Sequence, residues 1–526
     1  MLKVSNSMPI ANYSQVVISD NSGATFKPKT NSRIRLNLPT TLGMIDFKSS
    51  YLQFETKVLP HSGLGTSNSY KYGWSNKQGS EQIVRDLIVR VGGKPLETIT
   101  NYNVLDKVRK DYQNDMTLDN LHSIYNHATL KADNPSYETT AWDATTPTLN
   151  YNNVGQKQHM HLDLSGLLSS SSGFPIVSSG NVEVEIILED QELVLSNQHT
   201  LLGCNGTDTT SAGDGSLTDL DISEANLGLM GWDNEDNPLV AGNVIKVVAD
   251  DAGAVKTRYF NIVSNAKDGD GSKITINAPA GTYTNSGALT KIVIDVLQNV
   301  NDPASPTTAP TPVSNSLWDY QVENVEFVVR TIDMPPDYLS GIQRRIQSEG
   351  LVVDVPTYTM YLSNIQPNVG TQSLIVPCYS SRVRSVVSVP IKSGQPNYEY
   401  ERKGAVDGLR NYQAKIGSRV EPQRPVDLTN WTTNVQHQYH SQEHIQEMTK
   451  ALISTGIGER SLVNWRDNFV IGRSLSYNGS SEDLSDTGFR WEIQYNTNNN
   501  DAKLSYNFVN SIKRLQIVPT GVNIFG

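Results

Sequence analysis

Hydrophobic and polar residues alternate in short runs from the start of the chain. Residues 33–38 alternate with a period of two, which is typical of a strand with one buried face. Residues 51–58 repeat the pattern, and residues 83–99 predict two strands that turn at Gly92 and Gly93. Strands of a wholly buried parallel sheet would be apolar on both faces, so the pattern predicts antiparallel sheets.

A long insertion interrupts the first set of strands. Residues 182–188 and 325–330 alternate like two strands of one sheet, and residues 196–316 between them are acidic and rich in Gly, Asn and Asp. The insertion ends in a Pro- and Thr-rich run at 302–312, a composition typical of a stiff, extended tether. Its short strands are spaced as in a small β-barrel, which predicts a semi-independent module; they lie at 243–248, 258–263, 273–277 and 291–296.

Helices are few, and the strand pattern begins again after Gly350. Amphipathic helices are predicted at 101–114, 336–348 and 441–454. Further strands are predicted at 357–362, 373–376, 383–391, 469–476, 490–495 and 504–518. The order of elements predicts an all-β chain of two tandem modules joined by the helix near Pro336. No repeat is visible in the sequence, so the duplication is inferred from this order alone.

Composition and length agree with a multidomain protein that is rich in turns. The 526 residues are too many for one ordinary hydrophobic core, and 38 of them are Gly, which favours many turns. Two cysteines, Cys204 and Cys378, provide no disulfide framework and lack the paired spacing of a zinc site, which favours a reducing compartment. Because neither a signal peptide nor an apolar window of membrane-spanning length is found, we expect a protein that is neither secreted by the usual route nor membrane-spanning.

Charge is distributed unevenly along the chain. The formal net charge is −11, and residues 196–316 contain 14 acidic residues and 6 basic ones. Residues 1–40 contain five basic residues and one acidic residue. A basic N-terminal arm and an acidic insertion indicate two different surroundings, although the same charges also suit ordinary solvent-facing surfaces.

One short motif matches a catalytic signature. His440, Glu443 and His444 match the H-x-x-E-H arrangement of inverted zinc proteases, in which two His bind the metal and Glu is the general base. That site needs a third ligand, usually from a later helix, whereas the residues after Gly456 are predicted to be strand and loop. We therefore favour a structural role in which His444 borders the apolar stripe of a packing helix. A metal-dependent hydrolase centred on these three residues is the alternative.

The acidic string at residues 268–272 resembles the opening of a calcium loop. Lys273 stands where the tight-turn Gly is needed and Pro279 where the bidentate carboxylate is needed, so we predict a hairpin turn instead. The sequence has no phosphate-binding loop, nucleophile elbow or dinucleotide fingerprint. No catalytic, cofactor-binding or metal-ligating residue is predicted.

A basic tract with interleaved Tyr residues has the composition of a nucleic-acid-binding surface. We favour pairing between subunits or simple solvation over genome binding, because no RNA- or DNA-binding motif accompanies the tract. Its members are Arg382, Arg384, Lys392, Arg402, Lys403, Arg410, Lys415, Arg419 and Arg424, with Tyr379, Tyr398, Tyr400 and Tyr412.

Residues 333–391 resemble the junction of a known capsid fold. Met-Pro-Pro-Asp-Tyr-Leu at 334–339 leads into a helix, Thr-Tyr-Thr-Met-Tyr at 357–361 follows as a strand, and residues 373–390 begin Ser-Leu-Ile-Val-Pro-Cys. This order is similar to the junction between the two rolls in double jelly-roll major capsid proteins of virophages, polinton-like viruses and their relatives in the adenovirus-type lineage. Residues 28–58 and 505–524 are similar to the first and last strands of that family.

The resemblance covers nearly the whole chain and implies two tandem antiparallel jelly rolls with a few short helices. It implies an N-terminal arm at 1–30, a first roll at 31–335 and a second roll at 336–526. The insertion at 196–316 lies within the first roll and corresponds to a tower or loop decoration, although its size and its barrel-like strand spacing depart from the family.

The implied function is structural and not enzymatic, with pseudo-hexagonal homotrimers tiling an icosahedral shell. The expected partners are the chain itself, neighbouring capsomers, and penton and minor capsid proteins. The N-terminal arm would face the interior, toward the genome or a membrane, and the acidic insertion would lie outside. No cofactor or small-molecule substrate is expected, and the expected location is the virion, after assembly inside the host cell. The alternative is a viral surface adhesin or fibre protein whose inserted β module binds glycans.

Overall fold

Two β modules with the same strand order make up most of the structure. In each module the first, eighth, third and sixth strands form one antiparallel sheet, and the second, seventh, fourth and fifth form the other. This order is that of a jelly roll, a long hairpin of strand pairs rolled into two facing sheets. The computed structural model describes residues 12–19, 25–60, 70–74, 80–112, 140–142, 158–170, 173–196, 204–206, 219–222, 244–251, 254–268, 271–277, 290–297, 303–310, 318–393, 408–428, 442–454, 469–476, 480–495 and 502–526.

The first roll is built from the sheets β1-β18-β3-β8 and β2-β10-β5-β6, and β9 also pairs with β3. The alternation predicted for its second strand is confirmed, because Ile34, Leu36 and Leu38 are at most 1% exposed. The hairpin predicted at Gly92 and Gly93 is also confirmed; both have positive φ (56° and 79°), which glycine adopts without strain. The strands are β1 (Asn12–Ser19), β2 (Arg33–Leu38), β3 (Met44–Pro60), β5 (Val84–Val91), β6 (Lys94–Thr100), β8 (Gln158–Met160), β9 (Phe174–Pro175), β10 (Val182–Leu188) and β18 (Trp318–Asp333).

The second roll is built from the sheets β19-β26-β21-β24 and β20-β25-β22-β23, and β27 pairs with β26. Each strand predicted after Gly350 overlaps an observed one. β22 and β23 were not predicted as strands. A bulge between Leu409 and Asn411 breaks the alternation of β22, and β23 has one buried residue, Val426, and therefore no apolar face. The strands are β19 (Leu351–Ile365), β20 (Thr371–Val376), β21 (Val383–Lys392), β22 (Leu409–Ile416), β23 (Arg419–Asp427), β24 (Ile471–Ser474), β25 (Phe489–Tyr495), β26 (Lys503–Val518) and β27 (Gly521–Phe525).

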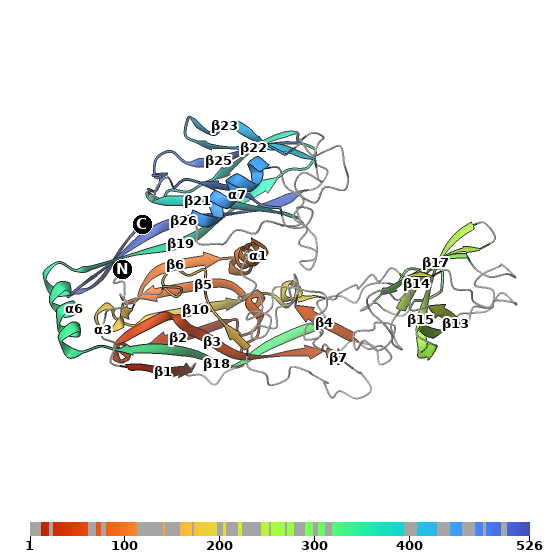
Figure 1. Cartoon of the computed structure of the whole chain (residues 1–526), viewed down its shortest axis with the longest axis horizontal. Coiled ribbons are helices and arrows are strands. Elements are labelled where there is room, and N and C mark those ends of the chain that lie inside the picture. The colour runs from red at the N-terminus through yellow and green to blue at the C-terminus, as the bar shows by residue number, and fades with distance from the viewer. Residues whose placement is uncertain are drawn as a thin grey trace.

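The helices extend the duplication. α1 (Tyr102–Tyr112) follows the fifth strand of the first roll, and α7 (Gln442–Ser454) follows the fifth strand of the second. α6 (Pro336–Ser348) connects β18 to β19 at one end of the molecule (Figure 1), and its two buried residues are Ile342 and Ile346. All three helices were predicted within one or two residues. The shorter helical segments are η1 (Thr40–Leu42), η3 (Ser80–Ile83), α3 (Ile176–Ser179) and α4 (Gln191–Val194).

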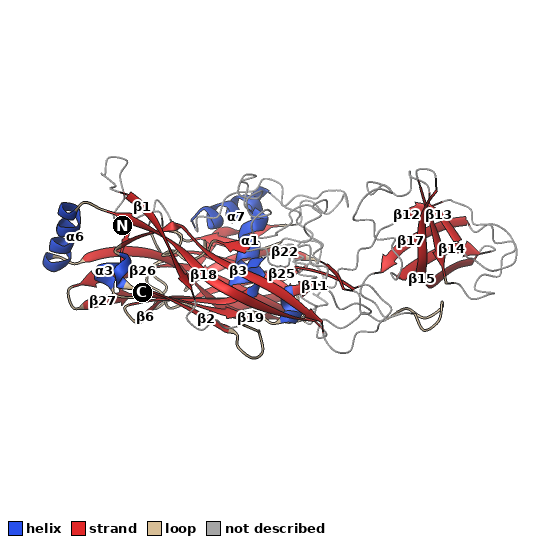
Figure 2. Ribbon diagram, turned by 90° about the horizontal axis from the view of Figure 1, so that it is seen from below, coloured by secondary structure: helices blue, strands red, loops and turns tan. Residues whose placement is uncertain are grey.

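The insertion forms a sheet of its own at the end of the molecule opposite α6 (Figures 1 and 2). Its strands follow the order β12-β17-β14-β15-β16-β13 and pair with no described strand of either roll. The four strands predicted here are confirmed, and Asp268 pairs with Gly271 across the predicted hairpin, whose two turn residues lie outside the described residues. The strands are β12 (Cys204–Gly206), β13 (Asp219–Ile222), β14 (Val244–Asp251), β15 (Ala254–Asp268), β16 (Gly271–Ile276) and β17 (Thr290–Leu297). Its independent folding stays a prediction.

A further small sheet of order β11-β4-β7 lies between the first roll and the insertion (Figure 1). It consists of β4 (Tyr70–Trp74), β7 (Thr140–Trp142) and β11 (Leu195–Ser196). β11 directly precedes the inserted segment, so this sheet borders the point at which the chain leaves the roll.

The N-terminal arm predicted at 1–30 is wrong for residues 12–19. All of β1 pairs with β18, from Asn12 opposite Asp333 to Ser19 opposite Glu326, because a strand edge offers backbone groups that need partners. Two of the five basic residues in the first 40, Arg33 and Arg35, lie in β2 and form ion pairs with Glu185. Residues 12–19 of the predicted arm therefore belong to the first roll, and Arg33 and Arg35 lie in the predicted roll itself.

The hydrophobic core joins the two rolls. One cluster of buried residues lies between the two sheets of the second roll and includes Phe489 and Trp491. The other fills the first roll and continues into the second through Val355, Phe508 and Leu515, all fully buried. Separating the rolls would expose this apolar surface, at a cost of about 25 cal/mol for each Å².

We expect Trp491→Ala to lower the free energy of unfolding by about 3–5 kcal/mol, because truncating a buried aromatic side chain leaves a cavity. Trp491 is 1% exposed and packs edge-on against Tyr412 and Phe489, at ring-centroid distances of 5.9 and 5.0 Å. Denaturant titration followed by circular dichroism measures the loss. The control is Ile375→Ala on neighbouring β20, 68% exposed; equal losses for the two variants would contradict the observed packing.

Candidate functional site

The H-x-x-E-H motif forms no metal site in the described part of the chain. His440 lies outside the described residues, and Glu443 is exposed at the start of α7. His444 is fully buried; its Nδ1 is 2.8 Å from the Tyr412 hydroxyl, and its ring stacks on Phe469. The predicted packing role of His444 is confirmed. Among the described residues, no three His, Cys, Asp or Glu side chains are grouped to hold a metal ion, and no helix is long and apolar enough to cross a membrane.

Members of the basic tract form ion pairs within the second roll. Arg382 pairs with Asp354 at 3.0 Å, and Lys415 pairs with Glu492 at 3.4 Å. Hydrogen bonds from Arg514 and Arg382 lower the pKa of Asp354 to about 2. These cations are partly neutralised within the fold, which weakens the case for a genome-binding surface. The tract residues at 398–403 lie outside the described residues.

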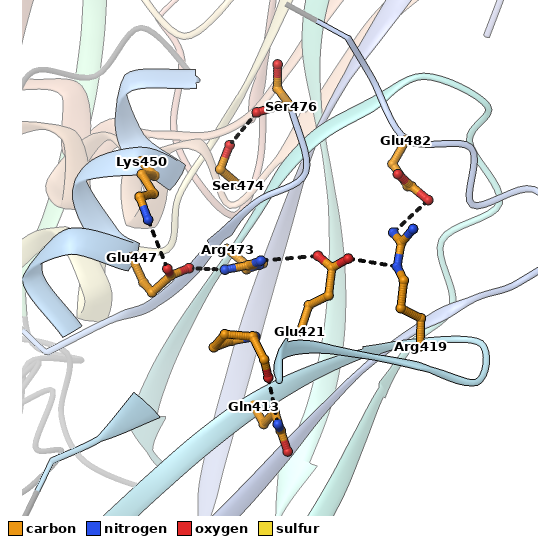
Figure 3. Close-up of polar contacts among 10 residues, drawn as sticks. Gln413, Arg419, Glu421, Glu447, Lys450, Arg473, Ser474, Ser476 and Glu482 are labelled. Atoms are coloured by element: carbon orange, nitrogen blue, oxygen red, sulfur yellow. Dashed lines mark hydrogen bonds and ion pairs between the residues drawn. The ribbon is translucent and has the colours of Figure 1, made fainter. Parts of the chain in front are cut away.

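A chain of ion pairs holds α7 to the edge of the second roll (Figure 3). Arg473 of β24 lies between Glu447 of α7 and Glu421 of β23, 3.1 Å from the latter. Arg419 continues the chain, at 2.7 Å from Glu421 and 2.9 Å from Glu482. The Arg473 side chain is only 18% exposed, so it has two carboxylate partners in a poorly solvated place. The network fixes α7 where the two sheet edges approach each other.

The junction between the two rolls is a reciprocal contact, which we call the seam. It consists of β6 and residues 162–168 of the first roll against β19, β26 and β27 of the second. Lys94 of the first roll donates to the carbonyl oxygen of Val522 at 2.6 Å, and Lys513 of the second donates to that of Leu96 at 3.0 Å. Each roll thus places a charged donor on a backbone acceptor of the other, and such charge-assisted bonds are stronger than neutral ones.

A buried carboxyl group lies beside the seam. Glu97 of β6 accepts hydrogen bonds from the Ser165 hydroxyl and from the backbone N–H groups of Gly166 (2.8 Å) and Leu167 (3.4 Å). Burial raises the pKa of Glu97 to about 7, although these bonds and the nearby Lys513 ammonium oppose the shift. Removal of the carboxylate from water is therefore the dominant effect, and the fold favours the protonated form more than water does.

Two glycines allow the rolls to approach closely. A Cβ atom on Gly166 would lie 1.9 Å from the backbone oxygen of Pro356, and one on Gly92 would lie 2.8 Å from the Val522 side chain. Because backbone lies against backbone at Gly166, no side chain could move aside to make room. Position 166 therefore requires glycine, because glycine has no Cβ atom to collide with Pro356.

Sequence reasoning did not find the seam. One signal was available: Glu97 and Ile99 share a face of β6, so a carboxyl group falls on the apolar side of a predicted strand. Its partners on residues 165–167 and on β26 are distant in sequence and follow no periodic pattern. The described contacts of this site hold the two rolls in one orientation.

No protein-family model matches the chain, and no curated protein matches it in sequence. The fold is similar to that of the Faustovirus major capsid protein, with a TM-score of 0.51 and 10% identity over 98% of this chain and 92% of that chain. A structure of the Sputnik virophage has a TM-score of 0.44 and 10% identity, over 100% of this chain and 91% of that one. The PBCV-1 virus capsid has a TM-score of 0.42 and 9% identity, over 100% and 99%. The predicted double jelly-roll fold is confirmed.

We expect Gly166→Ala to lower the free energy of unfolding by about 1–3 kcal/mol, because the added methyl group forces the backbones of the two rolls apart. The control is Gly341→Ala in α6, where a Cβ would meet nothing within 4 Å. That change replaces a helix-interior glycine and is expected to stabilise by about 0.5–1 kcal/mol. Thermal and denaturant unfolding measure both, and a neutral Gly166→Ala would contradict the observed close approach.

We expect the stability difference between the wild type and Glu97→Gln to depend on pH. The folded pKa of Glu97 lies above its ordinary value of 4.5, so its favourable contribution is complete below about 4.5 and is lost as pH rises through about 7. The wild type should therefore lose up to about 3 kcal/mol relative to the variant between these values, since one pKa unit corresponds to about 1.4 kcal/mol. Urea titrations at a series of pH values measure this difference, and a flat difference would disprove the assignment.

Proposed function

We propose that this chain is the major capsid protein of an icosahedral virus, a structural subunit that assembles with copies of itself into a shell. The observation that carries the proposal is the duplicated jelly roll, with both rolls fixed in one orientation by the seam. The similarity to the Faustovirus major capsid protein over nearly the whole of both chains supports it. The proposed role is mechanical and requires no catalytic group.

The proposed assembly unit is a homotrimer of pseudo-hexagonal outline. Each chain brings two units of the same strand order, so three chains in closed rotational symmetry bring six. Six near-equivalent units in a ring present similar edges in six directions, which suits a hexagonal lattice. Rigid linkage within each chain would then set the angle between neighbouring units.

Further partners follow from the same proposal. The insertion would face outward as a decoration, in keeping with its acidic composition and its place opposite α6. Penton and minor capsid proteins would contact the trimers, and the N-terminal segment would face the genome or a membrane inside the virion. Because β1 is a strand of the first roll, that interior contact cannot use residues 12–19 as a free arm.

We expect the purified full chain to have three times its 58.0 kDa monomer mass in solution, and to form particles of pseudo-hexagonal outline. Light scattering gives the mass and negative-stain imaging the outline. A stable monomer under assembly-permissive conditions would contradict the capsid proposal. It would favour the adhesin or fibre alternative, in which the inserted module binds glycans and the protein is sparse in the particle.

A further inference from the structure

We propose that the protonation state of Glu97 controls part of the seam. The neutral carboxyl group keeps residues 162–168 closed against the second roll, and its ionisation favours their release. We call residues 162–168 the latch segment; they belong to the first roll, and their Gly166 contacts Pro356 of β19. The change is a local opening of the folded chain, distinct from complete unfolding. It concerns the chain itself and does not depend on the capsid function.

Gly166 contacts both Glu97 and the second roll. Its N–H group donates to one carboxyl oxygen of Glu97 at 2.8 Å, and the N–H group of Leu167 donates to the other oxygen at 3.4 Å. A Cβ atom on Gly166 would lie 1.9 Å from the backbone oxygen of Pro356, so the backbone of this glycine lies directly against β19. A displacement of the latch segment that admits water to Glu97 therefore also disturbs this contact between the rolls.

The latch segment can move as a unit. It consists of turns and lies in no strand. Ser165 donates from its N–H group to the carbonyl oxygen of Leu162, and Leu168 donates to the Ser165 hydroxyl, both at 3.1 Å, so the turns are closed by bonds within the segment. Opening would therefore break no ladder of β-sheet hydrogen bonds. The buried side chains of Leu164 and Leu167 pack in the core that fills the first roll, and they keep the closed form the more populated one.

The proton determines the balance between the closed and open forms because closure removes the carboxyl group from water. Burial raises the pKa of Glu97 to about 7, whereas its hydrogen bonds and the ammonium group of Lys513 act in the opposite direction and are smaller effects. In the open form the hydrated group returns to its ordinary pKa of 4.5. The closed form binds the proton more tightly, so closure is favoured in acid and weakens as pH rises through about 7. With these two values, the opening constant rises about tenfold between pH 6 and pH 8.

Lys513 of β26 couples this proton to the second roll. Its ammonium group lowers the pKa of Glu97, and it donates to the carbonyl oxygen of Leu96, the neighbour of Glu97 in β6, at 3.0 Å. The attraction between Lys513 and an ionised Glu97 exists only while the seam is closed, and it partly opposes release. Removing the ammonium group should therefore raise the pKa of Glu97 further and move the opening to higher pH.

Other charged side chains on the segments around Glu97 have partners of their own. This leaves Glu97 and Lys513 as the pair through which a proton acts on this part of the seam. The other charged groups are Asp163 of the latch segment with Arg109 (2.7 Å), Asp354 of β19 with Arg382 and Arg514 (3.0 Å each), Arg90 of β5 with Glu183 (3.1 Å) and Glu185 (2.6 Å), and Lys94 of β6 with the carbonyl oxygen of Val522 (2.6 Å).

Hydrogen exchange of the folded full chain tests the opening of the latch segment. The exchange rates of the Gly166 and Leu167 amides are compared between the wild type and Glu97→Gln at the same pH, which cancels the intrinsic pH dependence of exchange. The ratio of wild-type to variant rates should rise about tenfold between pH 6 and pH 8. Amides of β25 in the same molecule provide a second reference, so the test also stands if Glu97→Gln does not fold.

A buried cysteine tests whether the seam opens together with the latch segment. Val355 of β19 is fully buried in the core shared by the two rolls, and Val355→Cys places a thiol there. Its labelling rate by a thiol reagent is compared between the Glu97 and Glu97→Gln backgrounds at each pH, which cancels the ionisation of the thiol itself. This ratio should rise together with the exchange ratio. The native Cys378, buried in the separate core of the second roll, should show no such rise.

Two further variants test the assignment to this pair. Lys513→Met should move the midpoint of the opening to higher pH. Glu492→Gln makes the same change as Glu97→Gln on β25, where Glu492 pairs with Lys415 at 3.4 Å, and it should keep the wild-type pH profile.

Three results would overturn the proposal. The first is an exchange ratio at Gly166 and Leu167 that does not change with pH. The second is a rising exchange ratio with a flat labelling ratio for Val355→Cys, because the latch segment would then open without the seam. The third is a midpoint that Lys513→Met leaves unchanged or lowers.

Discussion

The contact between the two rolls is the constraint on which the architecture depends. Jelly rolls are closed units, and a chain that contains two of them would by default allow relative motion. Here, the reciprocal bonds of Lys94 and Lys513 to backbone carbonyls, together with a core that continues from one roll into the other, remove that freedom. The two rolls therefore behave as one body, and the geometry of any larger assembly is set within the chain.

The sequence predicted the elements much better than their contacts. Strands with strict alternation, such as β2 and β25, could be located because one face of each packs into the core. β22 was missed because a bulge disturbs its period, and β23 because it has a single buried residue. Asn12–Ser19 was assigned to an arm from the positive charge of the first 40 residues, which does not show that this segment pairs with β18. The local pattern of apolar and polar residues gives the period of a strand, but it does not determine which other strands pair with it.

The contacts of the candidate site could not be predicted from the sequence for the same reason. Gly166 and Pro356 are 190 positions apart in sequence, and neither residue type at its position indicates a tight contact. His440, Glu443 and His444 attracted attention as a local motif, yet His444 fills a core position between Tyr412 and Phe469. The spacing of residues in the sequence can identify a site whose residues all lie on one helix or loop. The residues of the seam come from five separate segments of the chain, so their spacing carries no such signal.

The position of the insertion breaks the equivalence of the two rolls. It lies between the seventh and eighth strands of the first roll, whereas the corresponding connection in the second roll runs only from Tyr495 to Lys503. In any ring of these chains, decorated and plain units would alternate, so the ring has threefold and not sixfold symmetry. A neighbouring ring could then pack against it in two orientations that are not equivalent. In an otherwise uniform lattice, the insertion would be the feature that makes these two packings different.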